Sequence, residues 1–174
     1  MPLTVAIIGA GPLGRWLALS AARAGYRVLL EDVMPGNLHH AREEIRQQLN
    51  AEALPAVTFA AAIEDAVREA DLAVDCVPDE LESKLEILWL LDRMAPPRTI
   101  FATPTTRLAI DDLAQCVYRP DKVIAIAAEP QSLACGQTGP LRLCAAKATS
   151  AETVEIVERF WTSLGFVTSV DGRG

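Results

Sequence analysis

Short apolar runs and longer amphipathic stretches alternate along this chain from its start. Residues 3–8 form an apolar run, and residues 12–25 then carry leucine, tryptophan and alanine at spacings of three and four. A second apolar run covers residues 26–30. Runs of this length are typical of buried strands and the longer period of a helix, so the pattern predicts a strand–helix–strand unit.

The same alternation continues over the rest of the sequence. Further strands are expected over residues 57–59, 72–77, 99–102, 122–126, 141–146 and 166–170. Helices are expected over residues 36–53, 63–69, 81–94, 110–116 and 151–164. Residues 129–139 show no clear period and are expected to form a loop. Alternating strands and helices with short connections predict an α/β fold, a Rossmann-type doubly wound and mostly parallel sheet.

Composition narrows the class of protein. The 174 residues suit one domain over residues 1–174, and the formal net charge of −7 argues against nucleic-acid and anionic membrane partners. The first apolar run ends at Gly9, which is too short for a signal peptide or a membrane span. A cytoplasmic protein with small-molecule partners is therefore expected. Its cysteines form no C-x-x-C pair and are expected to be reduced and mostly buried: Cys76, Cys116, Cys135 and Cys144.

A glycine motif of the form G-x-G-x-x-G follows the first apolar run. Gly9 suits the tight turn after the strand, Gly11 permits close approach of a pyrophosphate, and Gly14 lets the next helix pack on the sheet. Pro12 and Leu13 fall in the first turn of that helix. The free N–H groups and the dipole of this turn would face a diphosphate.

An acidic residue follows the second apolar run. Asp32 lies eighteen positions after Gly14, where the fingerprint places an acid that accepts hydrogen bonds from the adenosine ribose. Its charge would repel a 2′-phosphate, and the next arginine is Arg42. The sequence therefore predicts a dinucleotide site with NAD, rather than NADP, as cofactor. A glycine turn without a ligand is the less favoured alternative, because strand, helix and acid occur together.

Three further segments resemble the N-terminal NAD-binding domain of 3-hydroxyacyl-CoA dehydrogenases, and the resemblance extends over almost the whole chain. They are residues 21–32, residues 75–84 and the stretch from residue 95 to residue 124. The resemblance implies a Rossmann fold, NAD as cofactor and an oxidoreductase that acts on a hydroxyl group. It also implies that four residues line the nicotinamide side of the cofactor: Val77, Pro78, Asp79 and Lys84.

The resemblance breaks down at the catalytic residues. In the family, a histidine paired with a glutamate takes the hydroxyl proton while hydride moves to NAD. Ala127 stands at the histidine position, and the glutamate position falls near Arg142. The family's Ser-Asn-Thr-Ser-Ser run becomes residues 103–107, with Pro104 at an asparagine and Thr106 at the catalytic serine. Thr106 is therefore the one candidate catalytic hydroxyl that this resemblance leaves.

Two functions remain open because alanine cannot accept a proton. The first is an NAD(H)-binding protein without the family's acid/base catalysis, to which a positioned base contributes about 10²- to 10⁴-fold. The second is an active oxidoreductase on a 3-hydroxyacyl-CoA or a small hydroxy or oxo acid. It would use Thr106 with Glu129, water or a partner chain. A pure interaction module that has lost NAD is a third, weaker reading.

Compared with the family, two elements that help to hold CoA are expected to be absent from this sequence. The connection from residue 49 to residue 57 leaves no room for the family's helical hairpin, and the sequence ends at residue 174, where the family continues into a helical domain. Without that domain, apolar surface near the end of the sheet is expected to be covered in a homo-oligomer.

The remaining candidates are weighed against ordinary structural roles. His39 and His40 are expected to be solvated at a polar helix start, and Cys135 to be a bystander rather than a reactive thiol. Glu129 and Arg142 form either a replacement acid/base pair or ordinary surface charges. The tryptophans are expected in the core: Trp16, Trp89 and Trp161.

Overall fold

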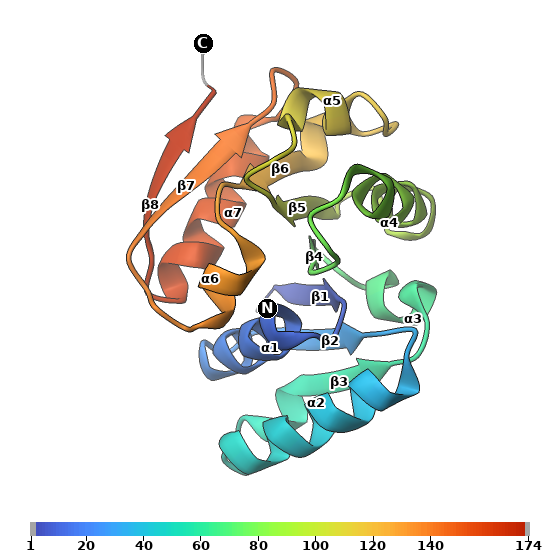
Figure 1. Ribbon diagram of the computed structural model, residues 1–174, viewed down its shortest axis with the longest axis vertical. Helices are drawn as coiled ribbons and strands as arrows, with labels where there is room; N and C mark the ends of the chain where they lie inside the picture. Colours follow the sequence, from blue (N-terminus) through green and yellow to red (C-terminus); the bar gives the residue numbers. More distant parts are fainter. Residues whose placement is uncertain (1–2, 173–174) are drawn as a thin grey trace.

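The computed structural model describes residues 3–172, which form one sheet with helices on both of its faces (Figure 1). The strands are β1 (Thr4–Ile8), β2 (Arg27–Glu31), β3 (Val57–Ala60), β4 (Leu72–Asp75), β5 (Ile100–Pro104), β6 (Val123–Ile126), β7 (Pro140–Ala145) and β8 (Val167–Asp171). The helices are α1 (Pro12–Arg23), α2 (Pro35–Gln48), α3 (Ile63–Val67), α4 (Leu81–Met94), α5 (Ile110–Ala114), α6 (Pro130–Ala134) and α7 (Ala151–Ser163).

The strand order is β3-β2-β1-β4-β5-β6-β7-β8. All neighbouring strands run parallel except β6 and β7, which are antiparallel. The chain winds outward from β1 to β3 and then returns to β4 on the other side of β1. The order of the strands therefore reverses between β1 and β4, and in sheets of this kind the crevice at the carboxyl ends of those strands is the usual ligand site.

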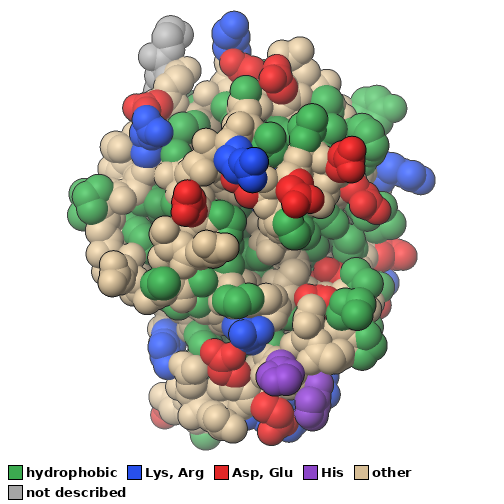
Figure 2. Space-filling view, in the orientation of Figure 1, with side chains coloured by type: hydrophobic (Ala, Val, Ile, Leu, Met, Phe, Trp, Pro, Cys, Tyr) green, Lys and Arg blue, Asp and Glu red, His purple; other side chains and the backbone are tan. Residues whose placement is uncertain are grey.

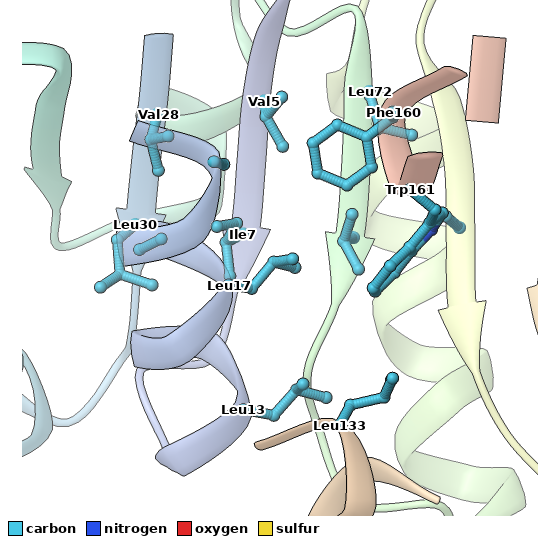
Figure 3. Close-up of a cluster of buried hydrophobic side chains, with 14 of the residues drawn as sticks. Val5, Ile7, Leu13, Leu17, Val28, Leu30, Leu72, Leu133, Phe160 and Trp161 are labelled. Atoms are coloured by element: carbon cyan, nitrogen blue, oxygen red, sulfur yellow. The ribbon is translucent and has the colours of Figure 1, made fainter. Parts of the chain in front are cut away.

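The core lies in two layers because side chains alternate between the faces of each strand. Val5 and Ile7 of β1 pack under α1, α2, α6 and α7, whereas Ala6 and Ile8 face α3, α4 and α5. Figure 3 shows the first layer, in which Leu17 of α1 lies over β1 and β2. Both faces of the strands are buried, which explains why they read in the sequence as continuous apolar runs.

The structure confirms the predicted Rossmann-type α/β fold, with differences in detail. Residues 130–134 form the short helix α6 instead of a loop, starting at Pro130 in the first turn. The equally short α3 and α5 each begin with an isoleucine that lies three and four positions before further apolar residues, whereas α6 begins with Pro130 and shows no such spacing of aliphatic side chains. The helix expected over residues 36–53 ends at Gln48, and a short 3-10 turn, Leu54–Ala56, follows. Ser150 caps α7 by accepting a hydrogen bond from the Thr153 N–H.

Two expectations about burial are wrong. Cys116 and Cys135 are exposed, and the other two cysteines are only half-buried, so the thiols are not mostly buried. Trp161 is fully buried and Trp16 packs against the core, but Trp89 is 51% exposed. The Trp89 indole N–H donates a hydrogen bond to the Cys116 carbonyl, 2.9 Å away. A tryptophan on the outer face of a helix reads as a core residue in the sequence because its neighbours are also apolar.

Within residues 3–172, none of the helices combines the length and the apolar character needed to cross a membrane.

The helix α1 packs closely against the turn after β1. A Cβ atom added to Gly14 would lie 1.8 Å from the Gly9 carbonyl oxygen and 2.9 Å from its carbonyl carbon. Backbone atoms cannot move aside as a flexible side chain can. Any side chain at Gly14 would therefore push α1 away from the sheet.

We expect Gly14→Ala to lower the free energy of unfolding by about 3 kcal/mol, because its methyl group has no space. A Cβ at Gly36, in the first turn of α2, meets nothing within 4 Å. Gly36→Ala is therefore the control and should stay within about 1 kcal/mol of the wild type. Urea unfolding measures the stability of both variants. A Gly14→Ala protein as stable as the Gly36→Ala control would show that a Cβ fits at Gly14.

Candidate functional site

A cavity of about 710 Å³ opens at the carboxyl ends of β1, β2 and β4, where the strand order reverses. Its walls come from the glycine turn, the ends of β2 and β4, and the starts of α2 and α6. The predicted residues that line it are Gly9, Gly11, Pro12, Leu13, Asp32, Val77, Pro78, Asp79 and Thr106. The fold thus brings together segments that lie almost one hundred residues apart in the sequence.

The glycine turn leaves the start of α1 open toward this cavity. Gly9 has a φ of +106°, a conformation that favours glycine, and its N–H donates to the Glu31 carbonyl at 2.8 Å. Gly11 precedes the first turn of α1, and no side chain caps that turn. A Cβ on Gly11 would meet nothing within 4 Å. The first N–H groups of α1 are therefore available to an anion that approaches over Gly11.

The Asp32 carboxylate lies between the glycine turn and the start of α2. Its Oδ2 accepts hydrogen bonds from the Ala10 N–H at 2.9 Å and from the Asn37 side-chain amide at 3.0 Å. Its Oδ1 accepts the Met34 N–H at 2.8 Å. Three donors hold the carboxylate in one orientation, and a carboxylate has room for about four hydrogen bonds. One acceptor position is left for a hydroxyl group in the cavity.

Glu31 immediately precedes Asp32, and its side chain also lines the cavity although it is only 2% exposed. Burial, together with the neighbouring Asp32 charge, raises the pKa of the Glu31 carboxyl to about 7. Two acids therefore lie side by side at the end of β2. A ligand that carries a further negative charge at this end of the cavity would be repelled.

At the other end of the cavity, the loop after β4 meets the loop after β5. Val77, Pro78 and Asp79 line the cavity, and the Asp79 Oδ2 accepts the Thr106 N–H at 3.2 Å. Lys84 does not line it. The Lys84 side chain is fully buried instead, and the resemblance that placed it at the nicotinamide side gave no sign of this.

Lys84 forms a buried ion pair with Asp75, the last residue of β4, at a distance of 2.5 Å between Nζ and Oδ1. Burial raises the pKa of the Asp75 carboxyl, while the Lys84 ammonium acts in the opposite direction. Each charge compensates the other in a site without solvent. The pair ties the first turn of α4 to the end of β4 and so fixes the loop that carries Val77 and Asp79.

The positions of the family's acid/base pair hold no such pair in this structure. Ala127 does not line the cavity, and its N–H donates to the Arg142 carbonyl at 2.8 Å. The Arg142 guanidinium pairs instead with Asp171, at 3.2 Å. Glu129 lines the cavity near α6, so it is separated from Arg142. Arg142 is therefore an ordinary surface charge, and a replacement pair between Glu129 and Arg142 is not formed.

The other minor candidates lie on the surface. His39 and His40 are exposed on α2, where Figure 2 shows the two histidine side chains next to each other on the surface. Cys135 is exposed at the end of α6 and is not among the residues that line the cavity. The expected exposure of the two histidines to solvent is confirmed.

Sequence reasoning did not identify several residues that line the cavity: Glu31, Asn37, Ile63, Ile87, Arg107 and Gln131. Glu31 carried a detectable signal, because an acid directly before the fingerprint acid interrupts an apolar run. Asn37 and Ile63 carried none, since their positions depend on how α2 and α3 pack. Their place in the wall is decided by tertiary contacts alone.

An open parallel sheet with a glycine turn before α1, an acid after β2 and a cavity at the reversal of strand order defines a Rossmann-type dinucleotide-binding domain. The sequence model of the 3-hydroxyacyl-CoA dehydrogenase NAD-binding domain matches residues 4–170. The chain therefore belongs to this family, whose cofactor is NAD. The resemblance seen in the sequence is thereby confirmed.

Individual relatives agree with this assignment. A probable 3-hydroxybutyryl-CoA dehydrogenase of Bacillus subtilis is 28% identical over 135 residues, covering 70% of this chain and 47% of the relative. The 5-formyl-3-hydroxy-2-methylpyridine 4-carboxylate 5-dehydrogenase of Mesorhizobium japonicum is 31% identical over 133 residues, covering 70% and 43%. This chain thus spans less than half the length of these two curated relatives.

A solved structure gives the same result. The 3-hydroxyacyl-CoA dehydrogenase of Archaeoglobus fulgidus superposes with a TM-score of 0.80 at 26% identity, covering 97% of this chain and 56% of that one. Nearly all of this chain therefore has a counterpart in a larger dehydrogenase.

We expect the stability of the ligand-free protein to depend on pH through Glu31. A carboxyl whose pKa is about 7 when folded, against 4.5 ordinarily, binds more protons in the folded state, so stability falls as pH rises between these values. From pH 5 to pH 8 the wild type should lose about 2 kcal/mol of unfolding free energy relative to Glu31→Gln. Urea unfolding of both proteins across this range measures the difference. If the unfolding free energies of the two proteins changed with pH in parallel, the raised pKa of Glu31 would be contradicted.

Proposed function

We propose that the 710 Å³ cavity is the NAD(H) site of this chain and that the chain lacks the family's acid/base catalysis. In this proposal the dinucleotide spans the switch point of the sheet. Its contacts are Gly9, Gly11, Pro12, Leu13 and Asp32 at the adenosine and diphosphate side, and Val77, Pro78 and Asp79 at the nicotinamide side. Gly14 and Lys84 act indirectly, by holding α1 and α4 in place.

The observation that carries the proposal is the pairing of an open helix start with a positioned acid. The uncapped first turn of α1 offers N–H groups to a diphosphate, and Asp32 keeps an acceptor position for a ribose hydroxyl. Gly11 leaves the approach between them open. The residues present therefore fit the cofactor of the family.

Two acids at the end of β2 support NAD rather than NADP. Glu31 and Asp32 are both nearly buried beside the place where the ribose would lie. A 2′-phosphate would meet this negative charge in a site of low dielectric constant, and the cavity wall near Asp32 offers no arginine or lysine to balance it.

The loss of standard catalysis rests on Ala127. When bound, NAD would accept or supply the hydride, but the hydroxyl proton also needs an acceptor. A methyl side chain supplies none, and the Ala127 backbone is engaged with β7. A positioned general base contributes about 10²- to 10⁴-fold to such reactions, so its absence is a large loss.

A second function is favoured by Thr106 and Glu129, which both line the cavity. In that case, Thr106 would hold a substrate oxygen by a hydrogen bond and Glu129 would take the proton, alone or with a partner chain. The substrate would be a small hydroxy or oxo acid, or an acyl-CoA. The Mesorhizobium relative, whose name gives a pyridine carboxylate as substrate, supports the small-acid class.

We expect the wild type to bind NADH with micromolar affinity in a calorimetric titration, and to bind NADPH at least about tenfold more weakly. Gly11→Val should lower the NADH affinity at least about tenfold, because its side chain would occupy the approach to α1, where a Cβ meets no protein atom within 4 Å. The unfolding free energy of Gly11→Val, measured with urea, should remain close to that of the wild type. A titration without heat or other sign of binding would refute the proposed site.

A turnover assay distinguishes NAD(H) binding without catalysis from an active oxidoreductase. With NADH and short 3-oxoacyl-CoA or 3-oxo acid substrates, we expect no oxidation above the rate without protein. Measurable turnover that Thr106→Ala abolishes, and that Thr58→Ala on the exposed face of β3 leaves unchanged, would establish the second function instead.

We also propose a homo-oligomer in the cytoplasm. Leu81, Trp89 and Met94 of α4 are exposed, and Tyr118 nearby is 93% exposed. The Tyr118 N–H donates to Asp92 of α4, and the Trp89 indole donates to the Cys116 carbonyl, so Trp89 and Tyr118 lie in one region of the surface. Apolar groups gathered in this way are commonly covered by another chain. Light scattering at micromolar concentration should give a mass above 18.7 kDa, and a monomer would reject the proposal.

A further inference from the structure

Glu31 occupies a position in the cavity that the proposed contacts of the diphosphate and ribose do not use. It is the last residue of β2, and alternation along the strand places its side chain on the face that α3 and α4 cover, with Leu29. Ile63 of α3 and Ile87 of α4 line the cavity on that same face. Glu31 is thus a buried acid among apolar walls.

Glu31 is only 2% exposed as a residue, and its carboxyl is reached through the cavity that it lines. None of the side-chain hydrogen bonds found among residues 3–172 involves this carboxyl, whereas its neighbour Asp32 accepts three. A nearly enclosed carboxyl without a protein donor takes its hydrogen bonds from what fills the cavity, water or a ligand.

No ion pair of Glu31 is found in the described part of the chain. The strands β1 and β3 on either side of β2 carry no charged residue, and α3 contributes only the exposed acids Glu64 and Asp65. Lys84 of α4 is paired with Asp75, and the arginine of the cavity wall, Arg107, belongs to the loop after β5. Arg15 of α1 is paired with Glu44 on the opposite face of the sheet. A neutral group that donates a hydrogen bond therefore suits this carboxyl better than a second acid does.

The direction of the proposed dinucleotide suggests that group. In the proposed site the diphosphate would lie over Gly11 and the adenosine ribose at Asp32, and the base would then extend to the part of the wall formed by Val33, Ile63 and Glu31. Val33 and Ile63 offer apolar surfaces to the faces of a flat ring. Among the polar groups of adenine, the exocyclic amino group is the donor, and the ring nitrogens around it are acceptors.

We propose that Glu31 recognises the adenine base, its carboxyl accepting a hydrogen bond from the exocyclic amino group. This inference rests on the proposed NAD(H) site and names the residue that selects the base. In the ligand-free protein the carboxyl has no donor among the described residues, and the bound base supplies one. At pH 8.5, where the carboxylate form predominates, replacing the amino group by a carbonyl oxygen places two acceptors opposite each other and removes this hydrogen bond, so the comparison is made at that pH.

The test compares NADH with the reduced nicotinamide hypoxanthine dinucleotide, which carries a carbonyl oxygen in place of the adenine amino group. Dissociation constants for both are measured by calorimetry and by nicotinamide fluorescence. The wild type should bind NADH about tenfold or more tightly than the hypoxanthine analogue. Glu31→Gln should keep its NADH affinity within about threefold and gain affinity for the analogue, because an amide both accepts and donates.

The matched control also removes one glutamate carboxylate, at an exposed position next to the cavity. Glu64→Gln alters an exposed acid beside Ile63 and should keep the preference of the wild type for adenine. Equal binding of both dinucleotides by the wild type would overturn the inference while leaving the NAD(H) site intact. A Glu31→Gln protein that changes both affinities by the same factor would also overturn it, since that pattern indicates a role toward the ribose or the overall charge. Absence of any NADH binding by the wild type would refute the NAD(H) site itself, and this inference with it.

Discussion

The contact between the backbone of α1 and the turn after β1 is the constraint on which the cofactor site depends. Gly14 lies so close to the Gly9 carbonyl that no Cβ atom fits between them. This contact brings the uncapped first turn of α1 to the edge of the sheet. The same turn is bonded to β2 through the Gly9 N–H and to Asp32 through the Ala10 N–H. One close backbone contact therefore sets the relative positions of the first turn of α1, Asp32 and the edge of the sheet.

A second, buried constraint fixes the opposite side of the cavity. The ion pair between Asp75 and Lys84 holds α4 against the end of β4, and Asp79 then bonds the loop that carries Thr106. Buried ion pairs contribute little net stability because desolvation offsets their attraction, but breaking one leaves an uncompensated charge. The pair thus determines geometry more than it adds stability. The two sides of the site are built by different physical means, close backbone packing and buried charge.

The two sides of the cavity differ in the functional groups that they carry. The side that receives adenosine and diphosphate keeps an open helix start, a positioned acid and an additional buried acid. The side that the proposed site assigns to the nicotinamide has Thr106 and Glu129 in its wall, and Ala127 is not part of that wall. The chain belongs to a family of NAD-binding domains and spans less than half the length of the two curated relatives described above.

The sequence alone determined the features that depend on near neighbours. The strand–helix alternation, the glycine motif and Asp32 follow from turn sterics and side-chain periodicity, which act over a few residues. Tertiary structure decided the rest: the burial of Lys84, the pairing of Arg142 with Asp171, the short helix α6 and the place of Glu31 in the cavity wall. Each of these depends on which distant segments pack together, and burial changes what a charged group costs and with what it pairs. Periodicity carries no information about those partners, because they are chosen by the packing of the whole sheet.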